Sequence, residues 1–198
     1  RQILRRTCQQ LKSWLQLSGG DRFKISLNLS GKHLASREQI MALVHIMESE
    51  GIALGYLIFE FNERELSRQD SDALTSLHEL RAKGIQISLD DFGTGFSSLN
   101  ALFHFPVDYI KVDDSFTHRM LQSPKDLALI RAMRDICQDL DFTLVVEGIE
   151  NQQQLQKLIE LGCAQGQGRH ISPPLPGSDI IPLLTQAGPP AESSLNPS

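Results

Sequence analysis

The chain has 198 residues, 40% of them hydrophobic, and its 24 acidic and 19 basic side chains give a formal net charge of −5. This length and apolar content suit one packed domain, whereas the negative charge argues against nucleic-acid binding, which relies on basic side chains to neutralise phosphates. No apolar run approaches the roughly 20 residues that a membrane-spanning helix needs, and no signal peptide is recognisable. We therefore expect no DNA or RNA partner and no membrane contact by this domain.

The three cysteines, Cys8, Cys137 and Cys163, are odd in number and far apart. Their spacing matches neither a zinc motif nor a disulfide framework, which favours a reducing, cytoplasmic setting. The first residue is Arg1 and not Met, so we interpret the chain as a piece of a longer protein.

Short apolar segments alternate with amphipathic helical stretches along most of the chain. Residues 2–17 predict a first helix, which Gly19 and Gly20 end. Six apolar segments follow, and most of them end at a polar residue. These segments are 23–27, 57–59, 85–89, 107–110, 144–146 and, more weakly, 164–167.

The alternation of strands and helices predicts parallel β-α-β units. None of the six units has a glycine-rich phosphate loop at its first turn, which favours an α/β fold of the TIM-barrel type over a Rossmann fold. Because six strands do not close an eight-stranded barrel, we expect a TIM-barrel-like (β/α)8 fold that is N-terminally truncated, with about two strands upstream of Arg1. We expect one domain over 1–186 and a flexible tail, rich in Pro and Ser, over 187–198.

Polar side chains follow the predicted strands, and active sites of barrels lie at the C-terminal ends of their strands. These residues are Asn28, Glu60, Asp90, Asp91, Lys111, Glu147 and Gln167. Carboxylate and amide oxygens suit Mg²⁺ or Mn²⁺. Adjacent carboxylates such as those of Asp90 and Asp91 repel each other unless a cation lies between them. The sequence therefore predicts a metal site at this end of the barrel.

Each of these residues also has a purely structural interpretation. Asp90 and Asp91 could cap a helix after a turn, and Glu60 could be a solvated strand exit. Lys111 could form a salt bridge at the rim, Glu147 could be a helix N-terminal acid, and Gln167 could lie in a simple turn. The metal-site interpretation is favoured because several successive strands each contribute an oxygen ligand.

Six motifs occur in the order in which they occur in the EAL domain family, which this chain resembles from its first helix to about residue 184. They are Asn28-Leu29-Ser30, Glu60-Phe61-Asn62-Glu63, Asp90-Asp91-Phe92-Gly93-Thr94-Gly95-Phe96-Ser97-Ser98-Leu99, Lys111-Val112-Asp113, Glu147-Gly148-Ile149-Glu150 and Gln167-Gly168. The resemblance implies a modified TIM barrel that hydrolyses cyclic di-GMP to linear pGpG with two Mg²⁺ or Mn²⁺ ions.

The resemblance also implies a role for each motif residue. One metal ion would have the ligands Asn28, Glu60 and Asp90, and the other would have Asp90, Asp91 and Glu147. The remaining implied roles are an attacking water held by Lys111, a general base at Glu147, support of water or phosphate by Gln167, substrate binding by Asp113 and Gln167, and loop stabilisation by Glu63 and Glu150.

The chain departs from the family at several points. The Glu-Ala-Leu motif does not occur in it, Asn62 replaces the usual Thr, His33 stands where Gln is common, and Arg169 replaces an aromatic residue. We expect a cyclic di-GMP phosphodiesterase that is the output domain of a larger signalling protein, with a homodimer and an upstream sensor or GGDEF domain as partners. The alternatives are a catalytically inactive domain that acts as a cyclic di-GMP receptor or protein-interaction regulator, and another Mg²⁺-dependent barrel enzyme of the enolase type.

Overall fold

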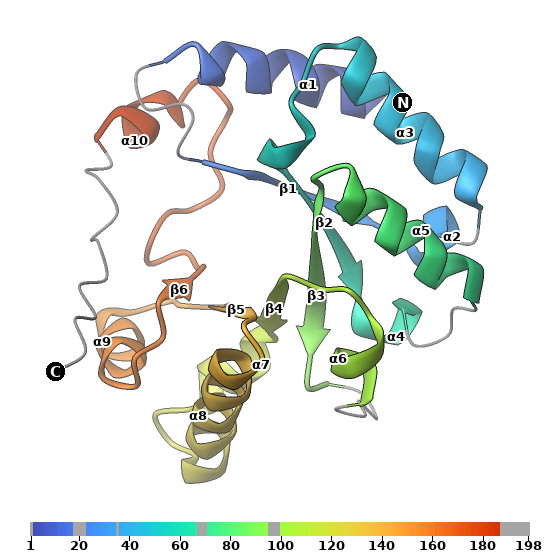
Figure 1. Cartoon of the computed structure of the whole chain (residues 1–198). Coiled ribbons are helices and arrows are strands. Elements are labelled where there is room, and N and C mark those ends of the chain that lie inside the picture. Colours follow the sequence, from blue (N-terminus) through green and yellow to red (C-terminus); the bar gives the residue numbers. More distant parts are fainter. Residues whose placement is uncertain (1, 18–22, 35, 67–70, 95–99, 187–198) are drawn as a thin grey trace, which may run out of the picture.

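The computed structural model describes residues 2–17, 23–34, 36–66, 71–94 and 100–186 (Figure 1). Within them, six strands form one sheet in which neighbours along the chain are neighbours in space and every pair is parallel. The strands are β1 (Ile25–Leu29), β2 (Leu57–Asn62), β3 (Gln86–Phe92), β4 (Tyr109–Val112), β5 (Thr143–Val146) and β6 (Gln165–Gly166). The predicted order of parallel strands is confirmed, while the predicted tail over 187–198 lies outside the described residues.

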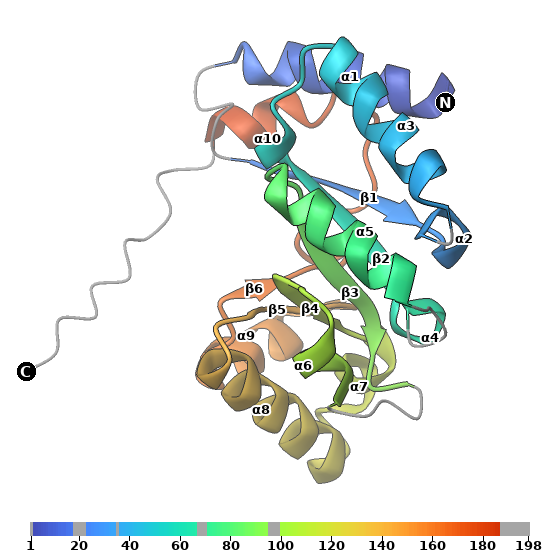
Figure 2. The same ribbon diagram turned by 45° about the vertical axis from the view of Figure 1, so that its right-hand side comes forward.

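The longer helices comprise one that precedes β1 in the chain and four that lie between consecutive strands. They are α1 (Gln2–Leu15), α3 (Arg37–Ser49), α5 (Ser71–Ala82), α8 (Pro124–Asp139) and α9 (Gln152–Glu160). Helix α5 packs against β3 and α3 packs against α5, as Figure 2 shows, while α8 packs against β5. The described part of the chain contains no helix that is both long and apolar enough to cross a membrane.

Short helices connect the strands to these longer elements, and the sequence analysis did not predict them. They are α2 (Gly31–Leu34), the 3₁₀ helix η2 (Leu54–Tyr56), α4 (Glu63–Leu66), α6 (Asn100–His104), α7 (Asp114–Arg119) and α10 (Ile181–Gln186). Helices α4 and α7 directly follow β2 and β4, so each begins next to the polar residues at a strand end.

Polar side chains fix the starts of two longer helices. Ser36 caps α3, its side chain accepting a hydrogen bond from the backbone N–H of Gln39 at 3.3 Å. A reciprocal capping box that the sequence analysis missed joins Asn151 and Gln154 at the start of α9. Such caps satisfy backbone donors that have no partner within the helix.

The first four strands end further along the chain than the apolar segments that predicted them, whereas β5 ends at Val146 as predicted. Strand β1 includes Asn28, which pairs with Glu60 of β2, and Asn62 pairs with Asp90 of β3. Strand β3 continues through Asp91 to Phe92. The predicted ends of these four strands were therefore too early, because backbone pairing continues through polar residues such as Asn28, Glu60 and Asp90.

The three thiols are shielded by the core. Cys8 and Cys137 are buried and Cys163 is half-buried. Burial raises the pKa of all three thiols, that of Cys137 to about 12. Because the thiolate is the reactive form, we expect the folded protein at pH 7.5 to react far more slowly with an aromatic disulfide reagent than the same protein unfolded in guanidinium. Equal labelling of Cys137 in both states, measured by peptide mass spectrometry, would contradict this.

Candidate active site

A buried lysine on β4 is surrounded by carboxylates from three other strands or strand ends. The Nζ atom of Lys111 lies 2.7 Å from Oε1 of Glu147, 3.2 Å from Oε2 of Glu60 and 3.4 Å from Oδ1 of Asp90. Lys111 is 6% exposed and Glu60 is 5% exposed. The fold thus brings together four residues that the sequence analysis placed at separate strand ends.

The charges of this cluster determine the protonation of the lysine. Burial by itself lowers the pKa of Lys111, but the hydrogen bond and charge of Glu147 and the charges of Glu60 and Asp90 outweigh burial and raise that pKa above its ordinary value. Lys111 is therefore an ammonium that donates hydrogen bonds. Burial raises the pKa of Glu147, an effect opposed by Lys111 and reinforced by the charges of Asp90 and Glu60.

Three carboxylates of this end of the sheet are close enough to share a cation. One oxygen each from Asp90, Asp91 and Glu147 lie within 4.8 Å of one another. Because Mg²⁺ binds oxygen at about 2.0–2.1 Å in an octahedron, two of its ligands lie about 3–4 Å apart, so a small contraction would complete the contact. Together with Glu60, these carboxylates outnumber the Lys111 ammonium by three charges, and the donor set fits hard divalent cations.

Asp91 adopts a backbone conformation that is uncommon outside glycine. Its φ angle is 56°, in the left-handed region that Asp tolerates better than most residues. Its backbone N–H donates to Oδ1 of Asp90 at 3.1 Å, and the side-chain amide of Asn62 donates to its Oδ2. Burial raises the pKa of Asp91, as do the charges of Asp90 and Asp113.

The start of α4 holds the loop that follows β3. The backbone N–H of Gly93 donates to Oε2 of Glu63 at 3.4 Å, and Nη2 of Arg64 donates to the carbonyl of Thr94 at 2.9 Å. Residues 95–99, which complete the long motif, lie outside the described residues. Arg64 is a residue of this site that the sequence analysis did not identify, since a lone Arg after a strand carries no local signal.

A hollow of about 520 Å³ lies beside the carboxylates. It is lined by Asn28, Leu29, Ser30, Asn62, Arg64, Asp90 and Asp91. Asn28 is exposed on β1 and lines the same hollow as Asp90 and Asp91. The hollow offers amide and carboxylate oxygens to a cation and one guanidinium to an anion.

The other three predicted residues lie around this centre. Asp113 caps α7, with Oδ1 accepting from the backbone N–H of Ser115 at 3.0 Å. The side chain of Gln167 is exposed beside the end of β5. Glu150 is exposed and its Oε1 lies 3.6 Å from Nε2 of His118, so it is not a member of the Lys111 cluster. Their roles stay predictions.

Gly168 passes so close to the backbone that no side chain fits there. A Cβ atom would lie 2.1 Å from the carbonyl oxygen of Ile149 and 2.3 Å from its nitrogen. We expect Gly168→Ala to lower the free energy of unfolding by about 1–3 kcal/mol and to shift Gln167. Chemical denaturation measures the first effect. Gly55→Ala is the control, because a Cβ there meets nothing within 4 Å; equal stability of both variants would contradict the close approach.

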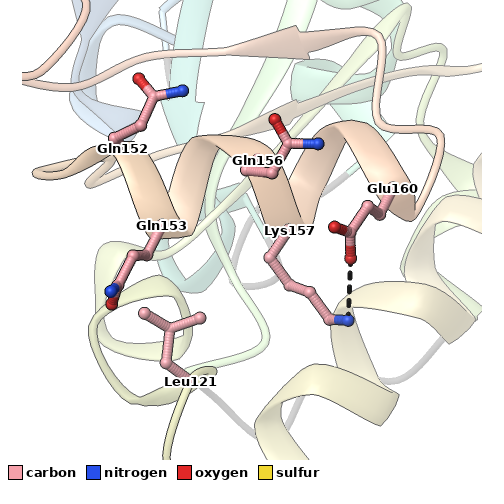
Figure 3. A pocket seen from close by; sticks show the side chains of 6 residues that line it. All are labelled: Leu121, Gln152, Gln153, Gln156, Lys157 and Glu160. Atoms are coloured by element: carbon pink, nitrogen blue, oxygen red, sulfur yellow. Dashed lines mark hydrogen bonds and ion pairs between the residues drawn. The ribbon is translucent and has the colours of Figure 1, made fainter.

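A second hollow, of about 380 Å³, lies between Leu121 and the exposed face of α9 (Figure 3). It is lined by Leu121, Gln152, Gln153, Gln156, Lys157 and Glu160. Its only two charged side chains, Lys157 and Glu160, form an ion pair with each other at 3.0 Å. This hollow lacks the surplus of carboxylates that marks the site around Lys111.

The chain is similar in sequence to a known domain family and to curated proteins. The sequence profile described as "EAL domain" matches residues 1–174. The "Cyclic di-GMP phosphodiesterase NbdA" of Pseudomonas aeruginosa is 35% identical over 195 residues, which are 96% of this chain and 25% of the relative. The chain thus spans about a quarter of the length of curated relatives such as this one.

Two solved structures agree with the fold. The EAL domain of Mycobacterium smegmatis DcpA is 31% identical, with a TM-score of 0.86 over 93% of this chain and 82% of that chain. The MucR phosphodiesterase of Pseudomonas aeruginosa in complex with cyclic di-GMP is 30% identical, with a TM-score of 0.83 over 90% of this chain and 72% of that chain. The six-stranded parallel sheet with its helices therefore has the TIM-barrel-like fold of these domains.

Proposed function

This chain belongs to the EAL domain family, and from that membership we propose that it is the catalytic domain of a phosphodiesterase that hydrolyses cyclic di-GMP to linear pGpG. The observation that carries the proposal is the cluster of Glu60, Asp90 and Glu147 around the buried Lys111. An enzyme that had lost this chemistry would be free to lose some of these buried charges, which are costly to keep unless they are used or paired.

We propose that the site holds two Mg²⁺ or Mn²⁺ ions, one on Asn28, Glu60 and Asp90 and the other on Asp90, Asp91 and Glu147. The mutual distances of the Asp90, Asp91 and Glu147 oxygens support the second set, and the shared hollow supports the inclusion of Asn28. When bound, such ions lower the pKa of a water and neutralise charge on the phosphodiester.

The other proposed roles in the reaction belong to side chains of the protein. Lys111 is enclosed by three carboxylates, so it stays charged, holds those carboxylates in place and donates a hydrogen bond to the attacking water. Glu147 is the nearest carboxylate to Lys111 and accepts the proton that the water gives up. Gln167 supports the water or a phosphate oxygen, and Asp113 contributes to substrate binding.

The test is the incubation of the full-length natural protein with cyclic di-GMP and Mg²⁺ or Mn²⁺, followed by chromatography of the nucleotides. We expect pGpG as the product. Binding of cyclic di-GMP in calorimetry without any pGpG would support a receptor instead, and indifference to cyclic di-GMP would support a different Mg²⁺-dependent barrel enzyme.

We further propose that residues 1–186 act in the cytoplasm as the output domain of a larger signalling protein, as a homodimer and with an upstream sensor or GGDEF domain. The greater length of the curated relatives supports the larger protein. Analytical ultracentrifugation of the full-length protein tests the dimer.

A further inference from the structure

We propose that Asn62 is a positioning residue: its side-chain amide fixes the Asp91 carboxylate and so sets the affinity of the metal ion that Asp91 binds. This role rests on the proposed metal-dependent reaction. It would help to set the concentration of Mg²⁺ or Mn²⁺ that the reaction needs. Asn62 is half-buried at the end of β2, pairs with Asp90 of β3 and lines the hollow beside both aspartates.

The two ends of the Asn62 amide have different partners. Its Nδ2 donates to Oδ2 of Asp91, and its Oδ1 accepts from the backbone N–H of Arg64 at 3.0 Å. A carboxylate needs a donor and a backbone N–H needs an acceptor, so the partners themselves fix the orientation of the amide. Asn62 therefore caps α4 in the manner of an N-cap residue while it holds a predicted metal ligand.

Among the residues that the structure describes, the Asn62 amide donates the hydrogen bond that holds the Asp91 carboxylate. Its carboxylate faces the like charges of Asp90 and Asp113, while Lys111 and Arg64 supply the opposing positive charges. Asp90 accepts from the backbone N–H of Asp91 and not from its side chain. Like-charge repulsion would therefore favour rotation of the Asp91 carboxylate toward solvent unless the amide donor opposed it.

The expected size of the effect follows from the behaviour of other metal sites. Side chains that hydrogen-bond a metal ligand orient it, and their loss costs about 10–100-fold in metal affinity. Only the ion that uses Asp91 should respond, because the amide of Asn62 has no contact with Glu60 or Asp90 among its recorded hydrogen bonds in the described residues.

The experiment compares Asn62→Ser with Asn62→Ala in the full-length protein. Serine is a good N-cap and keeps an acceptor for Arg64, but it is too short to reach Asp91, whereas alanine loses both contacts. Mn²⁺ binding is followed by calorimetry and by electron paramagnetic resonance of the free ion. Asn151→Ser is the control, since the Asn151 side chain also caps a helix, accepting from the backbone N–H of Gln154 at 3.0 Å, and lies outside the site.

For Asn62→Ser we expect one Mn²⁺ to bind as in the unchanged protein and the other to bind about 10–100-fold more weakly, with little change in the metal-free melting temperature. The Mg²⁺ concentration for half-maximal pGpG formation should rise by a similar factor, and kcat should recover at high Mg²⁺. Asn62→Ala should lose the same affinity and also some stability.

Unchanged affinity for both ions in Asn62→Ser would show that Asn62 is only a helix cap, and equal weakening of both ions would likewise overturn the role. If the unchanged protein binds no Mn²⁺ at all, the proposed function fails with it. Two tightly bound ions together with an unaffected Asn62→Ser variant would reject the positioning role alone.

Discussion

Replacing Asp90 by Asn in the full-length protein should lower kcat/KM for cyclic di-GMP by about 1,000-fold or more, which is about 4 kcal/mol of transition-state stabilisation. Asp90 is the residue assigned to both ions, and its Oδ1 also lies 3.4 Å from Nζ of Lys111. Asparagine keeps the shape of the side chain but removes its charge and one of its acceptor oxygens. Initial rates of pGpG formation at saturating Mg²⁺ give the measurement.

The control for this change is Asp139→Asn, which makes the same substitution at an exposed position of α8. Its kcat/KM should stay within about twofold of the unchanged protein, since isolated surface charges contribute little. An Asp90→Asn variant that kept a tenth of the activity, with high Mg²⁺ or without, would show that no ion depends on Asp90. The proposed assignment of ligands would then be wrong.

The second large effect concerns stability and not turnover. Without divalent ions, Lys111→Met should lower the free energy of unfolding by about 3–5 kcal/mol, the usual cost of removing one partner of a buried charge cluster. Methionine has a similar volume, so lost packing contributes little, whereas Glu60, Asp90 and Glu147 would stay half-buried or buried without their cation. Urea unfolding in the presence of a chelator measures the change.

Lys83→Met is the matched control, because Lys83 forms an exposed ion pair with Glu48 at 3.2 Å. Such surface pairs contribute about 0–1 kcal/mol, so this variant should unfold close to the unchanged protein. If both variants lost equal stability, Lys111 would not be the counter-ion of the carboxylates.

The pH dependence of this stabilisation has a definite sign. The folded protein raises the pKa of Lys111 above its ordinary value, so the folded state binds the proton more tightly than the unfolded state. The contribution of Lys111 is therefore fully present below its unfolded pKa of about 10.4 and is lost as the pH rises through the folded pKa. If Lys111 is the only group concerned, the unfolding free energies of the unchanged protein and of Lys111→Met should differ by the same amount at pH 7 and at pH 9.

The sequence predicts the order of elements and the gathering of charges for a simple reason. Parallel strands in one sheet have their C-terminal ends on the same side. Polar residues that follow successive strands therefore lie close together at that side. Glu60, Asp90, Lys111 and Glu147 meet for this reason. Their individual roles stay predictions, because position alone does not distinguish a metal ligand from a partner of Lys111.

The finer features depend on the register between strands, which local sequence does not encode. Asn62 reaches Asp91 only because β2 and β3 pair Asn62 with Asp90 and because Asp91 turns to a left-handed backbone conformation. The four-residue helix α4 gives no periodic signal in the sequence. Glu150, whose loop-stabilising role stays a prediction, lies 3.6 Å from His118 of α7, a pairing across distant segments that no motif spacing indicates.

The ammonium of Lys111 gives the protein a counter-ion of its own, present from the moment the strands assemble. Under the proposed two-ion site, folding and metal binding would be separate events, because the polypeptide could reach its native fold at low magnesium concentration and bind its ions afterwards. The concentration of free divalent ions would then limit how many molecules carry out the proposed reaction without changing how many are folded.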